Sequence, residues 1–198
     1  MCGRFYIDDD TARDIEKTIR MVDEKLRREI RTGDIHPSEK APVISCKNGD
    51  MIAENKKWGF PGFDSGKVIF NARSESVLEK RMFRESVMKR RLVIPASGFY
   101  EWNRNKEKVT FTSALEEQPV LYMAGFYNRF GDEDRFVILT TGANDSMADV
   151  HERMPILLKR EELEEWIRDD RRLEEFLHRE PHGLKRKMEY EQQTLFFS

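Results

Sequence analysis

Cys2 is the residue of this sequence whose position offers the most specific chemistry. Removal of Met1 by a methionine aminopeptidase, which acts when the second residue is small, would leave a cysteine with a free α-amine. An α-amine has a pKa of ~8, so a sizeable fraction of it is neutral at neutral pH. Such an amine attacks an aldehyde to give a Schiff base, and the thiol can then close onto the same carbon to form a thiazolidine. The alternative is that Cys2 is a small buried residue, which is the commonest fate of a free cysteine.

Three other segments carry groups that could handle protons in such a reaction. Asn71 and Arg73 lie two apart at the end of a predicted strand, so their side chains point to the same side. Glu101 follows a turn in SGFYEW, and His151 precedes a proline-bounded strand. Each has an ordinary alternative: Asn71 could cap a helix, Glu101 could pair with a surface arginine, and His151 could be a loop residue. Together, an amide, a carboxylate and a histidine are the groups that imine formation needs.

The first half of the chain is predicted to position these residues with two helices and several strands. An amphipathic helix is expected over residues 10–31, with Thr11 or Asp10 as its cap, because apolar residues recur there at helical spacing: Ile15, Ile19, Val22, Leu26 and Ile30. Strands are expected at residues 42–46, 50–58 and 67–71, because turn residues separate these apolar runs. The segment NARSES is expected to begin a second helix, capped by Ser74 or Ser76, that runs to about residue 90.

The second half adds strands and two short helices. LVIPASGFYEW is typical of a strand entering a turn, and residues 120–127 and 136–141 are expected to be strands. Two helical stripes follow in the acidic C-terminal region, formed by Leu163, Trp166 and Ile167 and by Leu173, Phe176 and Leu177. Because strands do not alternate regularly with helices, the pattern favours an α+β domain over a doubly wound sheet.

The composition excludes several classes of protein. The chain has 198 residues, which is enough for one domain with a sizeable core, and its two cysteines give no disulfide framework. No apolar run is long enough for a membrane span, and the N-terminus lacks the features of a signal peptide. We therefore expect a cytoplasmic protein. The cysteines and histidines show no metal-ligand spacing and no phosphate-binding glycine motif occurs, so we expect neither a metal nor a cofactor.

The net charge of −2 hides an uneven distribution. Residues 161–180 hold nine acids and four arginines, a balance of −5, so the rest of the chain carries +3. Residues 76–91 contain six basic side chains against two acids. This segment could be a solvated helix face or a patch for an anion.

Six segments together resemble one known family. They are MCGRF at residues 1–5, WGF at 58–60, FNARSES at 70–76, IPASGFYEW at 94–102, TTGAN at 140–144 and VHERMP at 150–155. In this order they are similar to the SRAP family of abasic-site-processing proteins, first labelled SOS-response-associated peptidases. The resemblance covers residues 2–158, and the remainder, residues 159–198, is expected to be a helical segment and tail of the same domain.

The resemblance implies a single domain, residues 1–198, in which irregular antiparallel and mixed β-sheets form a partly barrel-like core with flanking helices. It also implies a DNA-damage shield that binds single-stranded DNA, or a junction with duplex, and forms a thiazolidine between Cys2 and an abasic-site aldehyde. The catalytic residues carried over by motif are Cys2, Asn71, Glu101 and His151. The implied DNA-binding residues are Arg4, Pro37, Trp58, Arg73, Arg81, Trp102 and Arg153. We expect a monomer with abasic-site DNA as its partner. The resemblance also implies possible lyase activity and self-processing peptidase activity.

Other uses of Cys2 remain open. Class II glutamine amidotransferases, which are N-terminal-nucleophile amidohydrolases, also begin with MCG, but their further glutamine-binding segments are absent here. A thiol autopeptidase or protease could use Cys2, His151 and Glu101, but it would not need a free α-amine. A non-catalytic single-strand binder is a third alternative, which the intact set of four site residues argues against.

Overall fold

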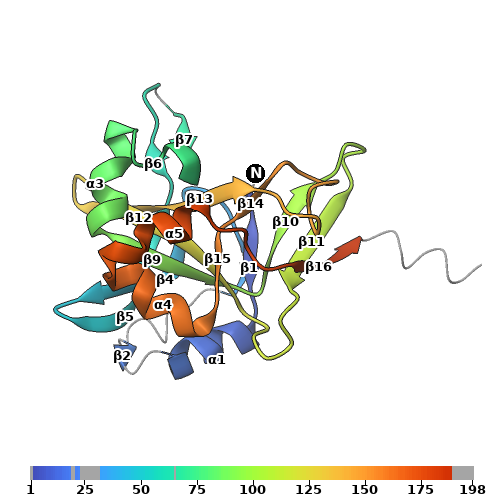
Figure 1. Ribbon diagram of the computed structural model, residues 1–198, viewed down its shortest axis with the longest axis horizontal. Coiled ribbons are helices and arrows are strands. Elements are labelled where there is room, and N and C mark those ends of the chain that lie inside the picture. Colours follow the sequence, from blue (N-terminus) through green and yellow to red (C-terminus); the bar gives the residue numbers. More distant parts are fainter. Residues whose placement is uncertain (1, 19–20, 23–31, 65, 189–198) are drawn as a thin grey trace, which may run out of the picture.

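The computed structural model describes residues 2–18, 21–22, 32–64 and 66–188, which form two β-sheets, a short hairpin and flanking helices (Figure 1). The strands are β1 (Phe5–Ile7), β2 (Met21–Val22), β3 (Gly33–Ile35), β4 (Lys40–Lys47), β5 (Asp50–Trp58), β6 (Phe60–Pro61), β7 (Val68–Ile69), β8 (Asn71–Arg73), β9 (Arg91–Ala96), β10 (Gly98–Trp102), β11 (Lys108–Ser113), β12 (Leu121–Phe130), β13 (Glu133–Gly142), β14 (Arg153–Pro155), β15 (Leu157–Leu158) and β16 (Leu184–Met188). The helices are α1 (Asp9–Thr18), η1 (Ser74–Ser76), α3 (Arg81–Lys89), η2 (Arg160–Glu162), α4 (Leu163–Arg168), η3 (Asp170–Arg172) and α5 (Leu173–His178).

The first sheet contains the start of the chain. Its strands follow the order β16-β11-β10-β1-β3, and each neighbouring pair is antiparallel. β1 lies inside this sheet, so Phe5 is opposite both Phe99 of β10 and Ile35 of β3. Phe5 and Ile7 are buried while Tyr6 between them is half-buried, which is the alternation of a strand with one face on the core.

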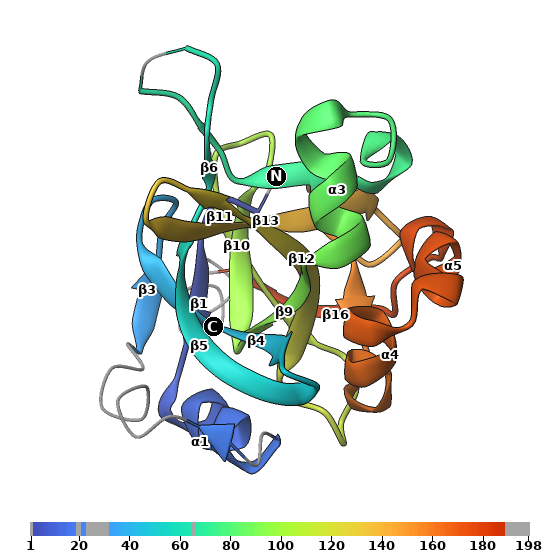
Figure 2. The ribbon, with the colours of Figure 1, turned by 90° about the vertical axis from the view of Figure 1, so that its left-hand side faces the viewer.

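The second sheet is mixed and closes on itself. Its strands follow the order β14-β13-β12-β9-β4-β5-β2, and β13 also pairs in parallel with β5, where Phe136 is opposite Trp58. The buried ammonium of Lys56 strengthens this closure, because it bonds the Asp134 carboxylate of β13 at 2.9 Å. A closed sheet flanked by helices is visible in Figure 2, and the predicted α+β class with a barrel-like core is confirmed.

The second sheet separates two hydrophobic clusters. Alternate residues of β9, β12 and β13 point either toward the first sheet or toward the helices, so their sequences are almost continuously apolar. Leu92 and Ile94, for example, pack with the cluster that contains Phe5, whereas Val93 packs with the cluster under the helices. The predicted stripes of α4 and α5 are buried in that second cluster, which confirms their assignment as core.

The helix predicted over residues 10–31 is wrong at residues 21–22. α1 ends at Thr18, and residues 21–22 form β2, which pairs in parallel with residues 52–53 of β5. The open edge of β5 overrides the helical spacing in this segment, because strand pairing satisfies backbone groups that the edge would leave exposed. Ile19, Leu26 and Ile30 lie outside the described residues. The cap is Asp8, whose carboxylate accepts the Thr11 N–H at 2.8 Å, instead of Asp10 or Thr11.

The predicted helix at NARSES is also wrong at its start. Residues 71–73 form β8, which pairs in parallel with β13, and only a 3-10 turn follows before α3 begins at Arg81. Ser74 is buried and neither it nor Ser76 caps a helix; extended Lys80 precedes α3 without a side-chain cap. The strands expected at 42–46 and 50–58 are confirmed as β4 and β5, joined by a turn in which Asn48 and Gly49 both have positive φ, at 54° and 89°.

Among the described residues, no helix combines the length and apolar character needed to cross a membrane.

Candidate active site and nucleic-acid interface

Cys2 lies just before β1 and is almost completely buried, with an exposed fraction of 2%. Its carbonyl oxygen accepts a hydrogen bond from Asn71 Nδ2 at 3.0 Å. The Arg4 backbone N–H is directed at the Cys2 thiol. Cys2 is therefore held by both its main chain and its side chain, and very little of its surface is exposed.

Glu101 faces Cys2 from β10. It is opposite Val109 of β11, points to the inner side of the first sheet and is 4% exposed. Burial, and then the negative charge of Glu101, raise the pKa of the Cys2 thiol well above its ordinary value. The thiol in this chain is consequently neutral at physiological pH, and a carboxylate stands close enough to affect its proton.

This environment predicts a pH dependence of stability. The folded thiol keeps its proton to higher pH than the unfolded one, whose pKa is about 9.0. Its contribution to stability is therefore complete below pH 9 and is lost as the pH rises further. Between about pH 8 and pH 10, the free energy of unfolding should fall by roughly 1 kcal/mol more for the wild-type chain than for Cys2→Ala. Urea unfolding at both pH values checks this, and equal falls for the two proteins would contradict it.

Asn71 lies on β8, where the pairing with β13 places it opposite Ile138. Its Nδ2 is used by Cys2, but within the described residues its buried Oδ1 has no hydrogen-bond donor. An unpartnered buried acceptor is costly. Since Asn71 already contacts the Cys2 main chain, this oxygen is a candidate acceptor for an N–H or O–H group that arrives at the site.

His151 and Arg153 are linked through the backbone. The Arg153 N–H donates to His151 Nδ1 at 2.9 Å, so a neutral imidazole carries its proton on Nε2. The neighbouring Val150 packs against the hydrophobic cluster that contains Cys2, as does Phe70 next to Asn71. The ring of His151 is therefore fixed as an Nε2–H donor on a segment that packs around the Cys2 pocket.

Arg153 is held by an acid that the sequence did not single out. Its guanidinium bonds both Glu75 oxygens, one of them at 2.8 Å, and the Thr140 carbonyl at 2.7 Å. The hydrogen bond from Arg153 lowers the pKa of Glu75. As placed, Arg153 could bind a phosphate only by exchanging Glu75 for it.

A cavity of about 610 Å³ opens beside Asn71. Its walls include the exposed cations Arg73 and Arg81, and the ring of Phe63, which is 89% exposed in the turn between β6 and β7. The sequence did not predict Phe63 as a site residue. The available signal was an aromatic residue inside the turn-rich segment PGFDSG, where no strand pattern provides for its burial.

Arg4, Trp102 and Pro37 lie in the first sheet or directly beside it: before β1, at the end of β10 and in the turn that follows β3. The Arg4 guanidinium stands 5.4 Å from the centre of the Trp102 ring, which is 40% exposed, and 3.7 Å from the Asp34 carboxylate. Pro37 is half-buried in the turn between β3 and β4. The predicted cation and aromatic of this group are therefore brought together on the surface.

The prediction that Trp58 lines a DNA path is wrong. Trp58 has an exposed fraction of 0%, its Nε1–H donates to the Phe70 carbonyl at 2.9 Å, and its ring packs on Phe5 and Phe136. A ring without exposed surface cannot stack on a base. Trp58 instead packs against β1 and β13 and holds the residue before β8 by a hydrogen bond.

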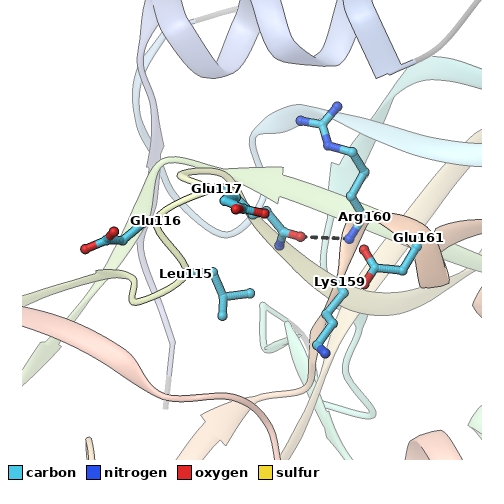
Figure 3. Close-up of a pocket in the computed structure, with 7 residues that line it drawn as sticks. Leu115, Glu116, Glu117, Lys159, Arg160 and Glu161 are labelled. Atoms are coloured by element: carbon cyan, nitrogen blue, oxygen red, sulfur yellow. Dashed lines mark hydrogen bonds between the residues drawn. The ribbon is translucent and has the colours of Figure 1, made fainter.

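A second cavity, of about 500 Å³, lies near α1 and carries a different kind of lining (Figure 3). Gln118 Oε1 accepts the Arg160 backbone N–H at 2.7 Å, and the Arg160 guanidinium is paired with Asp14. Three glutamates share its walls with Lys159 and Arg160. This mixture of charges, with its arginine already paired, does not form a surface for phosphates.

The chain is similar to proteins of one family. A model described as SOS response associated peptidase (SRAP) matches residues 1–192. The chain is 31% identical to the abasic site processing protein YoqW of Bacillus subtilis, over 84% of this chain and 80% of that protein. It is 28% identical to the abasic site processing protein YedK of Escherichia coli, over 86% and 81%, and 32% identical to YoaM of Bacillus subtilis, over 67% of this chain and 64% of that protein.

Solved structures show the same fold. A protein of Bacteroides thetaiotaomicron superposes with a TM-score of 0.79 at 22% identity, over 94% of this chain and 91% of that one. A protein of Bordetella bronchiseptica gives 0.76 at 23% identity, over 94% and 99%.

Proposed function

The chain belongs to the SOS response associated peptidase family, and we propose that it recognises abasic sites in single-stranded DNA and joins them covalently to Cys2. Its relatives YoqW and YedK are named abasic site processing proteins. The observation that carries the proposal is the convergence of Asn71 and Glu101 on Cys2, the residue that Met1 removal would make N-terminal.

The reaction would proceed in two bond-forming steps. The free α-amine of Cys2 attacks C1′ of the open-chain sugar, and the resulting carbinolamine loses water to give an imine. The thiol then adds to the imine carbon, so that a C–S bond forms, the C=N bond becomes single, and the thiol proton passes to nitrogen. The product is a thiazolidine, a five-membered ring made of the nitrogen, Cα, Cβ and sulfur of Cys2 and C1′ of the sugar.

Each neighbouring group has a role in this scheme. Asn71 would orient the amine, because its amide holds the Cys2 main chain and its oxygen can accept an N–H. Glu101 would accept the thiol proton and return it to nitrogen, which a neutral, buried thiol requires. His151 would donate from Nε2 to the sugar ring oxygen and so favour the open aldehyde, since its Nδ1 is occupied as an acceptor.

The DNA strand would pass on both sides of Cys2. On one side Arg73 and Arg81 would bind phosphates while Phe63 offers a ring for an adjacent base. On the other side Arg4 and Trp102 form a cation–ring pair that suits a phosphate and a stacked base. Pro37 stands near this end, where it would meet a duplex at a single-strand junction.

The rival uses of Cys2 fit the site less well. An amidohydrolase or thiol protease attacks with sulfur, and thiolate formation is opposed here by burial and by the charge of Glu101. The imine scheme does not need a thiolate for its first step, because nitrogen attacks first and the sulfur adds afterwards, as Glu101 takes its proton.

The test is a denaturing gel with single-stranded DNA that contains one abasic site. The full chain lacking Met1 should give a heat-stable, shifted adduct, whereas chain with an acetylated N-terminus and an intact thiol should give none. A protease would survive that acetylation. Failure of the unblocked chain to form an adduct would reject the proposed function.

A further inference from the structure

The outer side of the first sheet carries a continuous set of cations and rings. β11 alternates between buried and half-buried residues, with Val109 and Phe111 pointing inward and Thr110 pointing outward. Directly opposite residues of an antiparallel pair lie on the same face. Register therefore places Tyr100 of β10 and Lys187 of β16 on either side of Thr110. We call this surface the outer face: Tyr6, Tyr100, Trp102, Lys108, Thr110, Thr112, Lys185 and Lys187.

The tyrosine rings of the outer face form a platform. The rings of Tyr6 and Tyr100 stack with their centres 5.4 Å apart and their planes 25° apart. This arrangement needs a glycine at position 98, because a Cβ there would lie 2.7 Å from the Tyr6 ring. The Lys108 ammonium stands 5.1 Å from the centre of the Tyr100 ring. The platform thus combines ring surface with a positive charge at its edge.

Two lysines extend this platform to the edge of the sheet. Lys185 is opposite Thr112, Lys187 is opposite Thr110, and both are exposed. Neither forms an ion pair with an acid among the described residues, whereas Arg186 between them bonds Asp149 at 2.6 Å. Because side chains alternate along β16, Lys185 and Lys187 lie on the outer face without an acid partner among the described residues. Arg186 points to the opposite side and is paired with Asp149.

The outer face adjoins the proposed reactive site through Arg4 and β10, on which Glu101 points inward while Tyr100 and Trp102 point outward. Arg4 follows Cys2 in sequence, and its carbonyl accepts the Tyr100 N–H at 3.0 Å. At the end next to β3, Asp34 accepts the Tyr100 hydroxyl at 3.0 Å and also faces Arg4. Positive charge on this face consequently increases away from Asp34, from β1 toward β16. β10, β11 and β16 lie at one side of the molecule, away from the helices (Figure 1).

We propose that the outer face binds the single-stranded nucleic acid flanking the reacting nucleotide, with Lys185 and Lys187 on phosphates and Tyr100 against a base. Lysines spaced along a groove and rings that accept any base are the features that hold single strands without sequence preference. From β16 to β1 the face spans three strand spacings, roughly 15 Å, enough for a few nucleotides. This inference rests on the proposed function and adds to it the noncovalent binding of the flanking strand.

Protection of an exposed sheet edge is the competing explanation. β16 is a terminal strand of its sheet, and lysines on edge strands prevent pairing with other molecules. That role requires charge only at the edge. It does not account for the stacked tyrosines, or for the Lys108 ammonium beside Tyr100.

The experiment measures binding of undamaged oligothymidylate by fluorescence anisotropy, in a Cys2→Ala background that forms no stable adduct. The test variant is Lys185→Thr with Lys187→Thr, which keeps strand-forming residues. The matched control is Lys17→Thr with Lys47→Thr, which removes two exposed charges from α1 and β4. For an oligomer of about 20 nucleotides at low salt, the test variant should bind roughly 10-fold more weakly, with the salt slope reduced by about 1.4. The control variant should change less than about 2-fold.

A second variant keeps both lysines. Thr110→Glu places an acid between Lys187 and Tyr100, and it should weaken binding of the long oligomer to a similar extent. Circular dichroism confirms that each variant is folded.

Unchanged binding of the long oligomer by both variants would overturn the inference. So would aggregation of the lysine variant with normal affinity, which would establish edge protection. The covalent reaction is scored separately on an oligomer that contains one abasic site, with Cys2 intact. If no adduct forms there while long-strand binding still depends on Lys185 and Lys187, the proposed function fails and the outer face remains a binding surface.

Discussion

Cys2→Ala should abolish the heat-stable adduct with abasic-site DNA, reducing its yield by at least about 100-fold. Alanine is also a small residue, so Met1 should still be removed and a free α-amine should still reach the sugar. What the variant lacks is the sulfur that converts the imine into a ring. Its imine hydrolyses on heating, but borohydride reduction before denaturation should trap it as a secondary amine.

The same variant should cleave more DNA. An imine at C1′ makes the C2′ hydrogen acidic, so its loss expels the 3′ phosphate, and ring closure by the thiol normally removes the imine first. The matched control is Cys46→Ala, which alters the half-buried thiol of β4 and should form the adduct as wild type does. A heat-stable adduct from Cys2→Ala would show that another nucleophile reacts with the sugar.

Glu101→Gln should slow adduct formation by about 100-fold, the usual contribution of a positioned general base. Glutamine preserves the size of this buried side chain but cannot accept the thiol proton. Rates are measured by single-turnover gel assays with excess protein near pH 7. The deficit should narrow near pH 9, because burial still raises the thiol pKa but solution base becomes able to remove the proton.

Glu107→Gln provides the matched control for this prediction. Glu107 belongs to the same β10–β11 hairpin, where it bonds Asn103 at 2.7 Å. The change removes the same charge and should alter the rate less than about 2-fold. A Glu101→Gln deficit that stays constant from pH 7 to pH 9 would assign Glu101 to positioning instead of proton transfer.

Local sequence signals predicted the structure correctly where a segment pairs with the next segment along the chain. The Asn-Gly turn between two apolar runs predicted the β4–β5 hairpin, because turn chemistry and strand register are set within one short segment. The stripes of α4 and α5 were likewise readable, since their buried residues share one helical face.

Nonlocal pairing decided the segments where prediction failed. Val22 sits at helical spacing from Leu26, but the edge of β5 binds residues 21–22 as a strand. Asn71 precedes serines that commonly cap helices, but β13 binds residues 71–73 first. In both segments the paired residues lie at least thirty positions apart along the chain, beyond the reach of any local pattern.

At the site, the sequence likewise did not predict which aromatic residues are buried and which are exposed. A tryptophan followed by glycine gave no sign of whether its ring would face solvent, and Trp58 proved to be fully enclosed. Phe63, which the turn-rich segment PGFDSG did not mark as a site residue, is exposed to solvent and lines the same cavity as Arg73 and Arg81. The tethering of Cys2 by Asn71 also depends on strands that meet only in three dimensions.

The central place of β1 in its sheet has a consequence for the order of events during synthesis. Phe5 is clamped between Ile35 and Phe99, so the pocket around Cys2 cannot close before β10 has left the ribosome. At ordinary translation speeds this takes roughly 5–20 seconds. The nascent N-terminus is accessible throughout that interval, and removal of Met1, on which the proposed chemistry depends, has its widest window there. Removal of Met1 can therefore begin before the strands around Cys2 have paired.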